Sequence, residues 1–129
     1  MEATAFAPRI TSGRAAYSIL AALLLASILF EVVKHGTGYW QLAAFGLGPD
    51  LALLYGAAAG LEKGQLAPRA VPLYNLVHRF WLPLALIALA SFDLVPLGFF
   101  IGGLAWCFHI SLDRAVGYGL RTRDGFQRP

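Results

Sequence analysis

Long apolar stretches alternate with short polar ones along most of the chain. The apolar stretches cover about residues 15–33, 39–60, 71–92 and 94–113. Each has roughly the 20 residues that an α-helix needs to cross the hydrocarbon core of a bilayer. The pattern therefore predicts an all-α integral membrane protein, a bundle of four transmembrane helices, with residues 15–113 as its membrane domain.

The composition agrees with a membrane protein. Hydrophobic residues make up 58% of the 129 residues and charged residues only 13%, whereas soluble domains have roughly 45–50% and about 25%. A small chain has too much surface to cover with so few charges, so the lipid bilayer is the predicted partner. The net charge of +3 does not indicate nucleic acid, because the basic residues lie between apolar stretches and form no basic and aromatic platform.

The basic residues predict the orientation of the helices. Four spans leave both termini on one side, and eight of the ten lysines and arginines fall on that side, against Lys34 alone on the other. Because cytoplasmic loops carry the excess of Lys and Arg, both termini should be cytoplasmic. Residues 1–14 are then a cytoplasmic segment and residues 114–129 a basic, loosely ordered cytoplasmic tail. The eight are Arg9, Arg14, Lys63, Arg69, Arg114, Arg121, Arg123 and Arg128.

The second apolar stretch contains a signal for a break. It holds Gly46, Gly48 and Pro49 directly before Asp50. Proline removes a backbone donor and glycine weakens a helix, so we expect a kink or local unwinding there. Broken backbone at membrane depth is tolerated only where it faces protein or a wet cavity.

Strongly polar side chains lie inside three of the predicted helices, in their cytoplasmic halves. His109 and Asp113 are four residues apart, so they share one helix face. An ionised side chain in hydrocarbon costs at least about 2.5–3.5 kcal/mol, which pairing inside the bundle offsets. We therefore expect Asp50, His78, His109 and Asp113 to gather in the bundle core.

Two histidines and two carboxylates suit a divalent metal such as Zn²⁺, Mn²⁺ or Fe²⁺. The candidate ligands are His78, His109, Asp113 and Asp50, and either Asp50 or Asp113 is the candidate catalytic base. Tyr74 and Asn75, which share a face with His78, and Arg114 are candidates for orienting a substrate. The spacing equally allows a structural polar network or a proton path, and these alternatives stay open.

Two pairs of glycines are spaced for close helix packing. Gly56 and Gly60, and Gly98 and Gly102, are each separated by four positions. Such pairs let helix backbones approach one another in a membrane. Packing within one bundle is the favoured interpretation, and a homo-oligomer through these glycine faces is the alternative.

Several local sequences resemble a known family. They are Pro49-Asp50 followed by Tyr55, then Tyr74-Asn75-Leu76-Val77-His78, Trp106, and His109-x-x-x-Asp113-Arg114 with the run Gly117-Tyr118-Gly119-Leu120-Arg121. Together they resemble the bacterial membrane proteins of domain of unknown function 4260. The resemblance implies a small multi-span protein of the bacterial inner membrane and supplies no activity. The layout of carboxylates and histidines is also loosely similar to membrane-bound metal-dependent hydrolases, an analogy only.

The sequence thus leads to a hypothesis about function. It predicts an inner-membrane protein with a cytoplasm-facing His/Asp site inside the membrane, which binds a divalent metal and hydrolyses a lipid-linked or amphipathic substrate. One alternative is a proton-coupled small transporter or ion path that uses the same residues. The other is a structural or partner-binding membrane subunit without catalysis.

Overall fold

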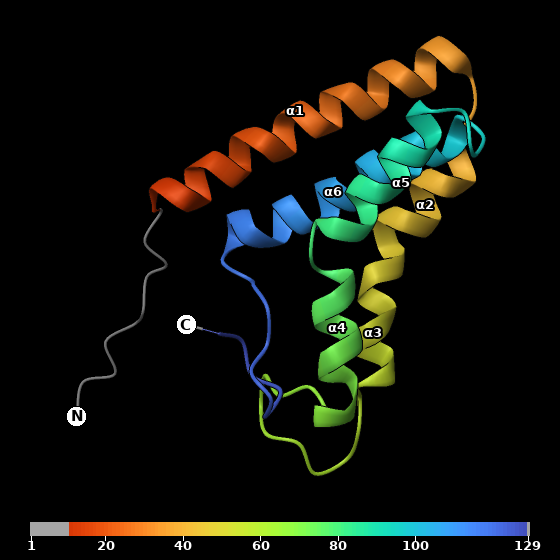
Figure 1. Ribbon diagram of the computed structural model, residues 1–129. Helices are drawn as coiled ribbons and strands as arrows, with labels where there is room; N and C mark the ends of the chain where they lie inside the picture. Colours follow the sequence, from red (N-terminus) through yellow and green to blue (C-terminus); the bar gives the residue numbers. More distant parts are fainter. Residues whose placement is uncertain (1–10, 129) are drawn as a thin grey trace.

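The computed structural model describes residues 11–128, and the regular structure of these residues is helical. The predicted all-α fold is therefore confirmed. The elements form four helical segments in chain order, of which the second and third are interrupted (Figure 1). The elements are α1 (Ser12–His35), α2 (Tyr39–Leu47), the 3₁₀ turn η1 (Gly48–Asp50), α3 (Leu51–Tyr55), the 3₁₀ turn η2 (Pro68–Ala70), α4 (Val71–Val77), α5 (Trp81–Ser91) and α6 (Gly98–Val116).

Helix α1 is apolar on nearly all sides. It begins after Thr11, whose side chain accepts a hydrogen bond from the Arg14 amide, and it ends at Gly36 in the left-handed conformation. Only Ala21 and Ile28 of this helix are buried. Ile28 packs against the centre of α6, and the outer leucines and valines remain exposed. A helix of 24 residues with so much exposed apolar surface is suited to lipid.

Three helices are long and apolar enough to cross a membrane. They are Ser12–His35, Pro68–Ser91 taken through its interruption, and Gly98–Val116. The chain is thus a membrane protein by the length and composition of its helices. The remaining helical segment, the second in the chain, consists of α2, η1 and α3, and it is broken at the point where Pro49 predicts a break.

The second interruption separates α4 from α5 at residues 78–80. No glycine at these positions predicts this interruption, but Pro83, which follows them, explains it. Pro83 cannot donate to the carbonyl of Arg79, and its ring clashes with a helical carbonyl at that position. A proline is tolerated in the first turn of a helix, and Pro83 is the third residue of α5.

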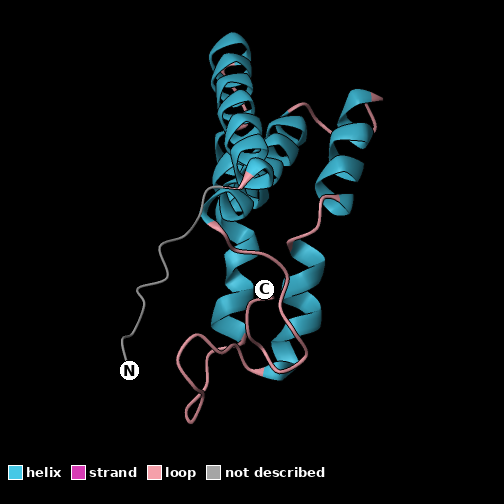
Figure 2. Cartoon of the chain, turned by 90° about the vertical axis from the view of Figure 1, so that its left-hand side faces the viewer, coloured by secondary structure: helices cyan, strands magenta, loops and turns pink. Residues whose placement is uncertain are grey.

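The two interruptions let a short hairpin leave the bundle. Figures 1 and 2 show α3 and α4 side by side, turned away from α1, α2, α5 and α6. We call residues 51–77 the α3–α4 hairpin. Its inner face buries Ala52, Leu66, Ala70 and Tyr74. The hairpin therefore has a small core of its own beside the bundle.

Residues 117–128, the C-terminal tail, lie along this hairpin (Figure 1). The Leu66 amide donates to the Gly125 carbonyl at 2.9 Å, and the Gln65 side chain donates to the Asp124 carbonyl at 2.8 Å. The composition led us to expect a loosely ordered tail. It is instead held by hydrogen bonds, because loop and tail backbones satisfy each other.

Glycines on α6 allow close packing within the chain. A Cβ at Gly98 would meet the Gln41 side chain, and one at Gly102 would meet the ring of Phe45 at 2.7 Å. Both neighbours belong to α2. This glycine face is therefore covered by the protein's own helix, in agreement with the favoured interpretation.

Gly103 provides a test of the packing between α5 and α6. A Cβ there would lie 2.5 Å from Ile87 Cγ1 and 3.2 Å from the Pro83 carbonyl oxygen, and a backbone carbonyl cannot move aside cheaply. We expect Gly103→Ala to destabilise the protein by about 1–3 kcal/mol. Gly48→Ala is the control, because a Cβ at Gly48 would have no neighbour within 4 Å and the φ of Gly48 is −54°. Thermal unfolding in detergent, followed by circular dichroism, should show a lower midpoint for Gly103→Ala only; equal midpoints would contradict the packing.

Candidate metal centre

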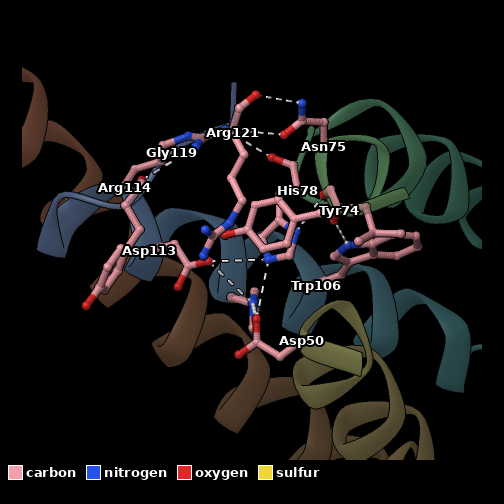
Figure 3. A network of polar contacts seen from close by, with 12 residues as sticks. Asp50, Tyr74, Asn75, His78, Trp106, Asp113, Arg114, Gly119 and Arg121 are labelled. Carbon is pink, nitrogen blue, oxygen red and sulfur yellow. Dashed lines mark hydrogen bonds and ion pairs between the residues drawn. The ribbon is translucent and has the colours of Figure 1, made fainter. Parts of the chain in front are cut away.

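Helix interruptions bring four chelating side chains together (Figure 3). Asp50 is the last residue of η1, and His78 caps the end of α4. His109 and Asp113 point to the same side of α6, as their spacing of four predicts. One ligand atom from each of the four residues lies within 4.8 Å of all the others. The His/Asp cluster that the sequence predicts is present in the structure.

Both histidines direct Nε2 toward both carboxylates. His109 Nε2 lies 3.1 Å from Asp50 Oδ1 and 3.5 Å from Asp113 Oδ2. His78 Nε2 lies 3.4 Å from Asp50 Oδ1 and 3.5 Å from Asp113 Oδ2. His78 Nε2 is buried and has no hydrogen-bond partner in the part of the chain that the structure describes. An orphaned buried nitrogen that faces two carboxylates calls for an explanation.

The other ring nitrogens fix the tautomers. His78 Nδ1 lies 2.8 Å from the Tyr74 carbonyl oxygen, and His109 Nδ1 lies 2.8 Å from the Gly46 carbonyl oxygen. A carbonyl oxygen only accepts, so each Nδ1 must carry the proton and donate. In the neutral rings, each Nε2 then presents a lone pair to the cluster. Metal-binding histidines are commonly oriented in this way.

These lone pairs create a need for a cation. A neutral Nε2 and a carboxylate oxygen are both acceptors, so at 3.1–3.5 Å they repel one another unless a proton or a metal ion lies between them. With a proton on its Nε2, His109 donates to Asp50 Oδ1 at 3.1 Å. Protonated rings or a shared metal ion would relieve the repulsion. In a tetrahedral site with bonds of about 2.1 Å, neighbouring ligand atoms are roughly 3.4 Å apart. The four His-to-Asp separations fall around this value.

Burial is graded across the cluster. The exposed fraction of the side chain is 1% for His78 and 10% for His109, but 23% for Asp113 and 50% for Asp50. The histidine side is closed by protein, and the site opens at Asp50. A bound ion would thus be held from one side and reached from the other.

Neighbouring groups hold His78 at the end of α4 (Figure 3). The Tyr74 ring stacks on the His78 ring, with 3.9 Å between centroids and 17° between planes. Arg114 Nη2 donates to the His78 carbonyl at 3.0 Å. Trp106 Nε1 donates to the Val77 carbonyl at 2.7 Å. The interruption between α4 and α5 therefore keeps its carbonyls satisfied, and the His78 ring stays in position.

The three candidates for orienting a substrate differ in their contacts. Asn75 forms two hydrogen bonds with the backbone of Arg121, at 3.0 and 2.8 Å, and so holds the C-terminal tail (Figure 3). Arg114 holds the His78 carbonyl. Tyr74 lines a cavity next to the cluster. Asn75 and Arg114 are thus engaged with protein backbone, whereas the Tyr74 ring is buried and contacts the His78 ring and the Arg121 guanidinium at the edge of that cavity.

That cavity has a volume of about 330 Å³, and we call it the polar cavity because charged residues form part of its wall. Asp50 and Asp113 form one part of the wall, and Arg121 and Gln127 of the tail form another. The remaining lining residues are Leu53, Tyr74 and Tyr118. Sequence reasoning did not single out Gln127, and it used Arg121 only to set topology. Basic residues in a tail usually face solvent, and the sole signal was the position of Arg121 in the Gly-Tyr-Gly-Leu-Arg run.

A second hollow, of about 200 Å³, lies next to the cluster and is apolar. Its lining includes Pro49 and Val77, which directly precede Asp50 and His78. Phe45 and Trp106 stack on each other in its wall, 5.7 Å apart. We call this hollow the apolar groove; its other lining residues are Ala44 and Gly48.

The fold and the cluster define a class: a small helical membrane protein with a His/Asp group that could hold a metal ion. The family model of a domain of unknown function, DUF4260, matches residues 17–129, so the chain belongs to that family, as the resemblance predicted. No curated protein and no solved structure matches the chain.

Proposed function

We propose that this protein is a metal-dependent hydrolase of the bacterial inner membrane, with its site reached from the cytoplasmic side. The observation that carries the proposal is the arrangement of four ligand atoms within 4.8 Å of one another, with both Nδ1 atoms fixed as donors. Nitrogen and oxygen ligands of this kind suit Zn²⁺, Mn²⁺ or Fe²⁺.

The exposed fractions of the four side chains support different roles for them. His78, His109 and Asp113 are the ligands, because they are the three most enclosed members. Asp50 is the general base, because half of its side chain is exposed and the residue lines the cavity. A divalent metal lowers the pKa of a bound water toward neutrality. Asp50 would accept the proton of the attacking water and return it to the leaving group.

The orientation rests on the basic residues. The tail and the α3–α4 hairpin lie together, and Arg69, Arg121 and Arg123 belong to this region. Because positive charge is retained on the cytoplasmic side, this end of the protein faces the cytoplasm, with both termini. The polar cavity, which Arg121 lines, then opens toward the same compartment.

The metal content of the protein purified in detergent tests the proposal. Elemental mass spectrometry should find about one Zn, Mn or Fe ion per chain, and the double variant His78→Ala/His109→Ala should lose it. His35→Ala is the matched control, because His35 pairs with Glu31 at 3.1 Å outside the cluster and should keep the ion. Circular dichroism and gel filtration must show that each variant is folded. Absence of metal in the wild type after dialysis against these ions would refute the hydrolase.

A proton path is the second candidate. The distances of 3.1–3.5 Å also fit ion pairs between protonated histidines and the two carboxylates, and ionisable residues inside membranes often relay protons. A pH-driven flux in proteoliposomes that Asp50→Asn abolishes would favour it. If the double variant His109→Ala/Asp113→Ala only lowers stability and no chemistry or flux is found, the cluster is a structural network in a membrane subunit.

A further inference from the structure

We propose that the substrate is a phosphate ester of a lipid, with its phosphate in the polar cavity beside the metal and its hydrocarbon chain in the apolar groove. This inference rests on the proposed function and names its substrate class. It is carried by two hollows of different character at the cluster. Asp50 and Asp113 line the polar cavity, and Pro49 and Val77, which line the apolar groove, directly precede Asp50 and His78.

The charges favour an anion in the polar cavity. Two carboxylates balance a divalent ion, and the neutral histidines add no charge, so Arg121 leaves the loaded site cationic. The guanidinium of Arg121 lies 4.8 Å from the centre of the Tyr74 ring, whose other neighbour is the His78 ring. The Tyr74 ring thus contacts both Arg121 and the proposed metal ligand His78. A metal and an arginine at the same cavity suit a phosphate better than a neutral ester.

Unused donors point to the same ligand. Arg121 Nε and Gln127 Nε2 are buried and have no hydrogen-bond partner among the described residues. Both residues line the cavity, and other atoms of their side chains are already anchored. Arg121 Nη1 donates to the Gly125 carbonyl at 2.8 Å, and Gln127 Oε1 accepts from the Gly119 amide at 2.8 Å. Both donor atoms are covered by protein, so the two side chains would have to turn for a phosphate to reach them; phosphate oxygens can accept several hydrogen bonds at once.

The apolar groove supplies the second half of the substrate. Pro49 and Val77 line it, while their neighbours Asp50 and His78 belong to the cluster. A bound amphiphile would therefore pass the cluster with its ester bond at the junction between head and chain. Phe45 and Trp106 give the groove the aromatic and apolar wall that a hydrocarbon chain needs.

Hydrolysis at this junction transfers the phosphoryl group from the lipid alcohol to water. The water oxygen forms a bond to phosphorus, and the phosphorus–oxygen bond to the lipid alcohol breaks. Asp50 takes the proton released by the water and passes it to the departing alkoxide. The products are inorganic phosphate or a phosphomonoester and a lipid alcohol, and no further reactant is required.

The test uses the full-length protein in detergent, loaded with Mn²⁺, and three variants with matched roles. Arg121→Gln removes the cation of the polar cavity, and Arg123→Gln, an exposed arginine of the same tail, is its control. Ala44→Trp fills the apolar groove from an exposed position in its wall. Binding of inorganic phosphate is measured by isothermal titration, and phosphate release is measured on phosphatidic acid in mixed micelles and on soluble p-nitrophenyl phosphate.

We expect Arg121→Gln to bind inorganic phosphate roughly ten- to a hundredfold more weakly than wild type or Arg123→Gln, because a charge-assisted hydrogen bond is lost. Ala44→Trp should bind inorganic phosphate normally and lose about tenfold in kcat/KM on phosphatidic acid only. Equal phosphate affinity of the wild type and Arg121→Gln would overturn the phosphate assignment. If kcat/KM in Ala44→Trp falls equally on both substrates, or falls on neither, the assignment of the hydrocarbon chain to the apolar groove would be overturned. The Mn²⁺ content of the same samples separates these failures from failure of the hydrolase itself.

Discussion

Asn in place of Asp50 should lower the hydrolytic kcat by roughly 10²–10⁴-fold, the usual contribution of a general base, while the metal stays bound. The amide matches the carboxylate in shape but cannot accept the proton of the attacking water. Half of the Asp50 side chain is exposed and the residue lines the cavity, so the change should leave the enclosed ligands undisturbed. The measurement is the rate of ester hydrolysis beside the metal content of the same preparation.

Two further variants make this test specific. Asp93→Asn is the control for the chemical change itself, because Asp93 lies in the connection from α5 to α6, at a left-handed φ of 57° that Asn tolerates. It should keep both rate and metal. Asp113→Asn should instead lose the metal, since Asp113 is assigned as a ligand. An Asp50→Asn protein that loses its metal, or that keeps the full rate, would contradict the assignment of Asp50 as base.

The structure explains why the cluster forms at helix interruptions. Gly46 lies in the last turn of α2 and Tyr74 in the last turn of α4. Carbonyls in a last turn have few backbone partners, and a carbonyl oxygen has two lone pairs. The Tyr74 carbonyl therefore accepts from the His78 ring as well as from the His78 amide, which lies at 3.1 Å. These two carbonyls orient His109 and His78. The same helix ends carry partial negative charge, which favours a cation between them.

Part of this arrangement could be predicted from the sequence. The spacing of His109 and Asp113 gives a shared helix face, and Pro49 marks the first break. The cost of burying charge in a membrane argues for bringing Asp50 and His78 to the same place. These local rules were sufficient to name the four members of the cluster.

Other features depend on contacts between distant segments. The break at residues 78–80 follows from Pro83, yet proline in a membrane helix often gives only a kink, so the pattern left the third helix continuous. The position of the tail depends on hydrogen bonds from Asn75 and Leu66 to tail backbone. Because nearly all residues have the same backbone groups, the sequence does not indicate which of these groups form the hydrogen bonds. The polar cavity, which needs Arg121 and Gln127 beside the cluster, was therefore beyond sequence reasoning.

The tail should detach from the α3–α4 hairpin when Gly125 is replaced with Ala. Gly125 has a φ of +98°, and a Cβ there would collide with the backbone carbonyl of Leu66, the residue that donates to Gly125. Left-handed backbone costs a residue with a side chain about 1–2 kcal/mol, and the collision adds to it. Hydrogen–deuterium exchange should rise at least tenfold over residues 117–128 and at the Leu66 amide.

Gly64→Ala separates the collision from the backbone strain. Gly64 also has a positive φ, +78°, but no atom lies within 4 Å of its Cβ position, so exchange in this variant should stay near the wild-type rate. Because the cluster residues lie outside the tail, Gly125→Ala should keep its metal. It should nevertheless bind inorganic phosphate at least tenfold more weakly, since Arg121 leaves the cavity with the tail. Unchanged exchange would show that the contact between Leu66 and Gly125 does not hold the tail, and unchanged phosphate binding with a detached tail would remove Arg121 from the binding site.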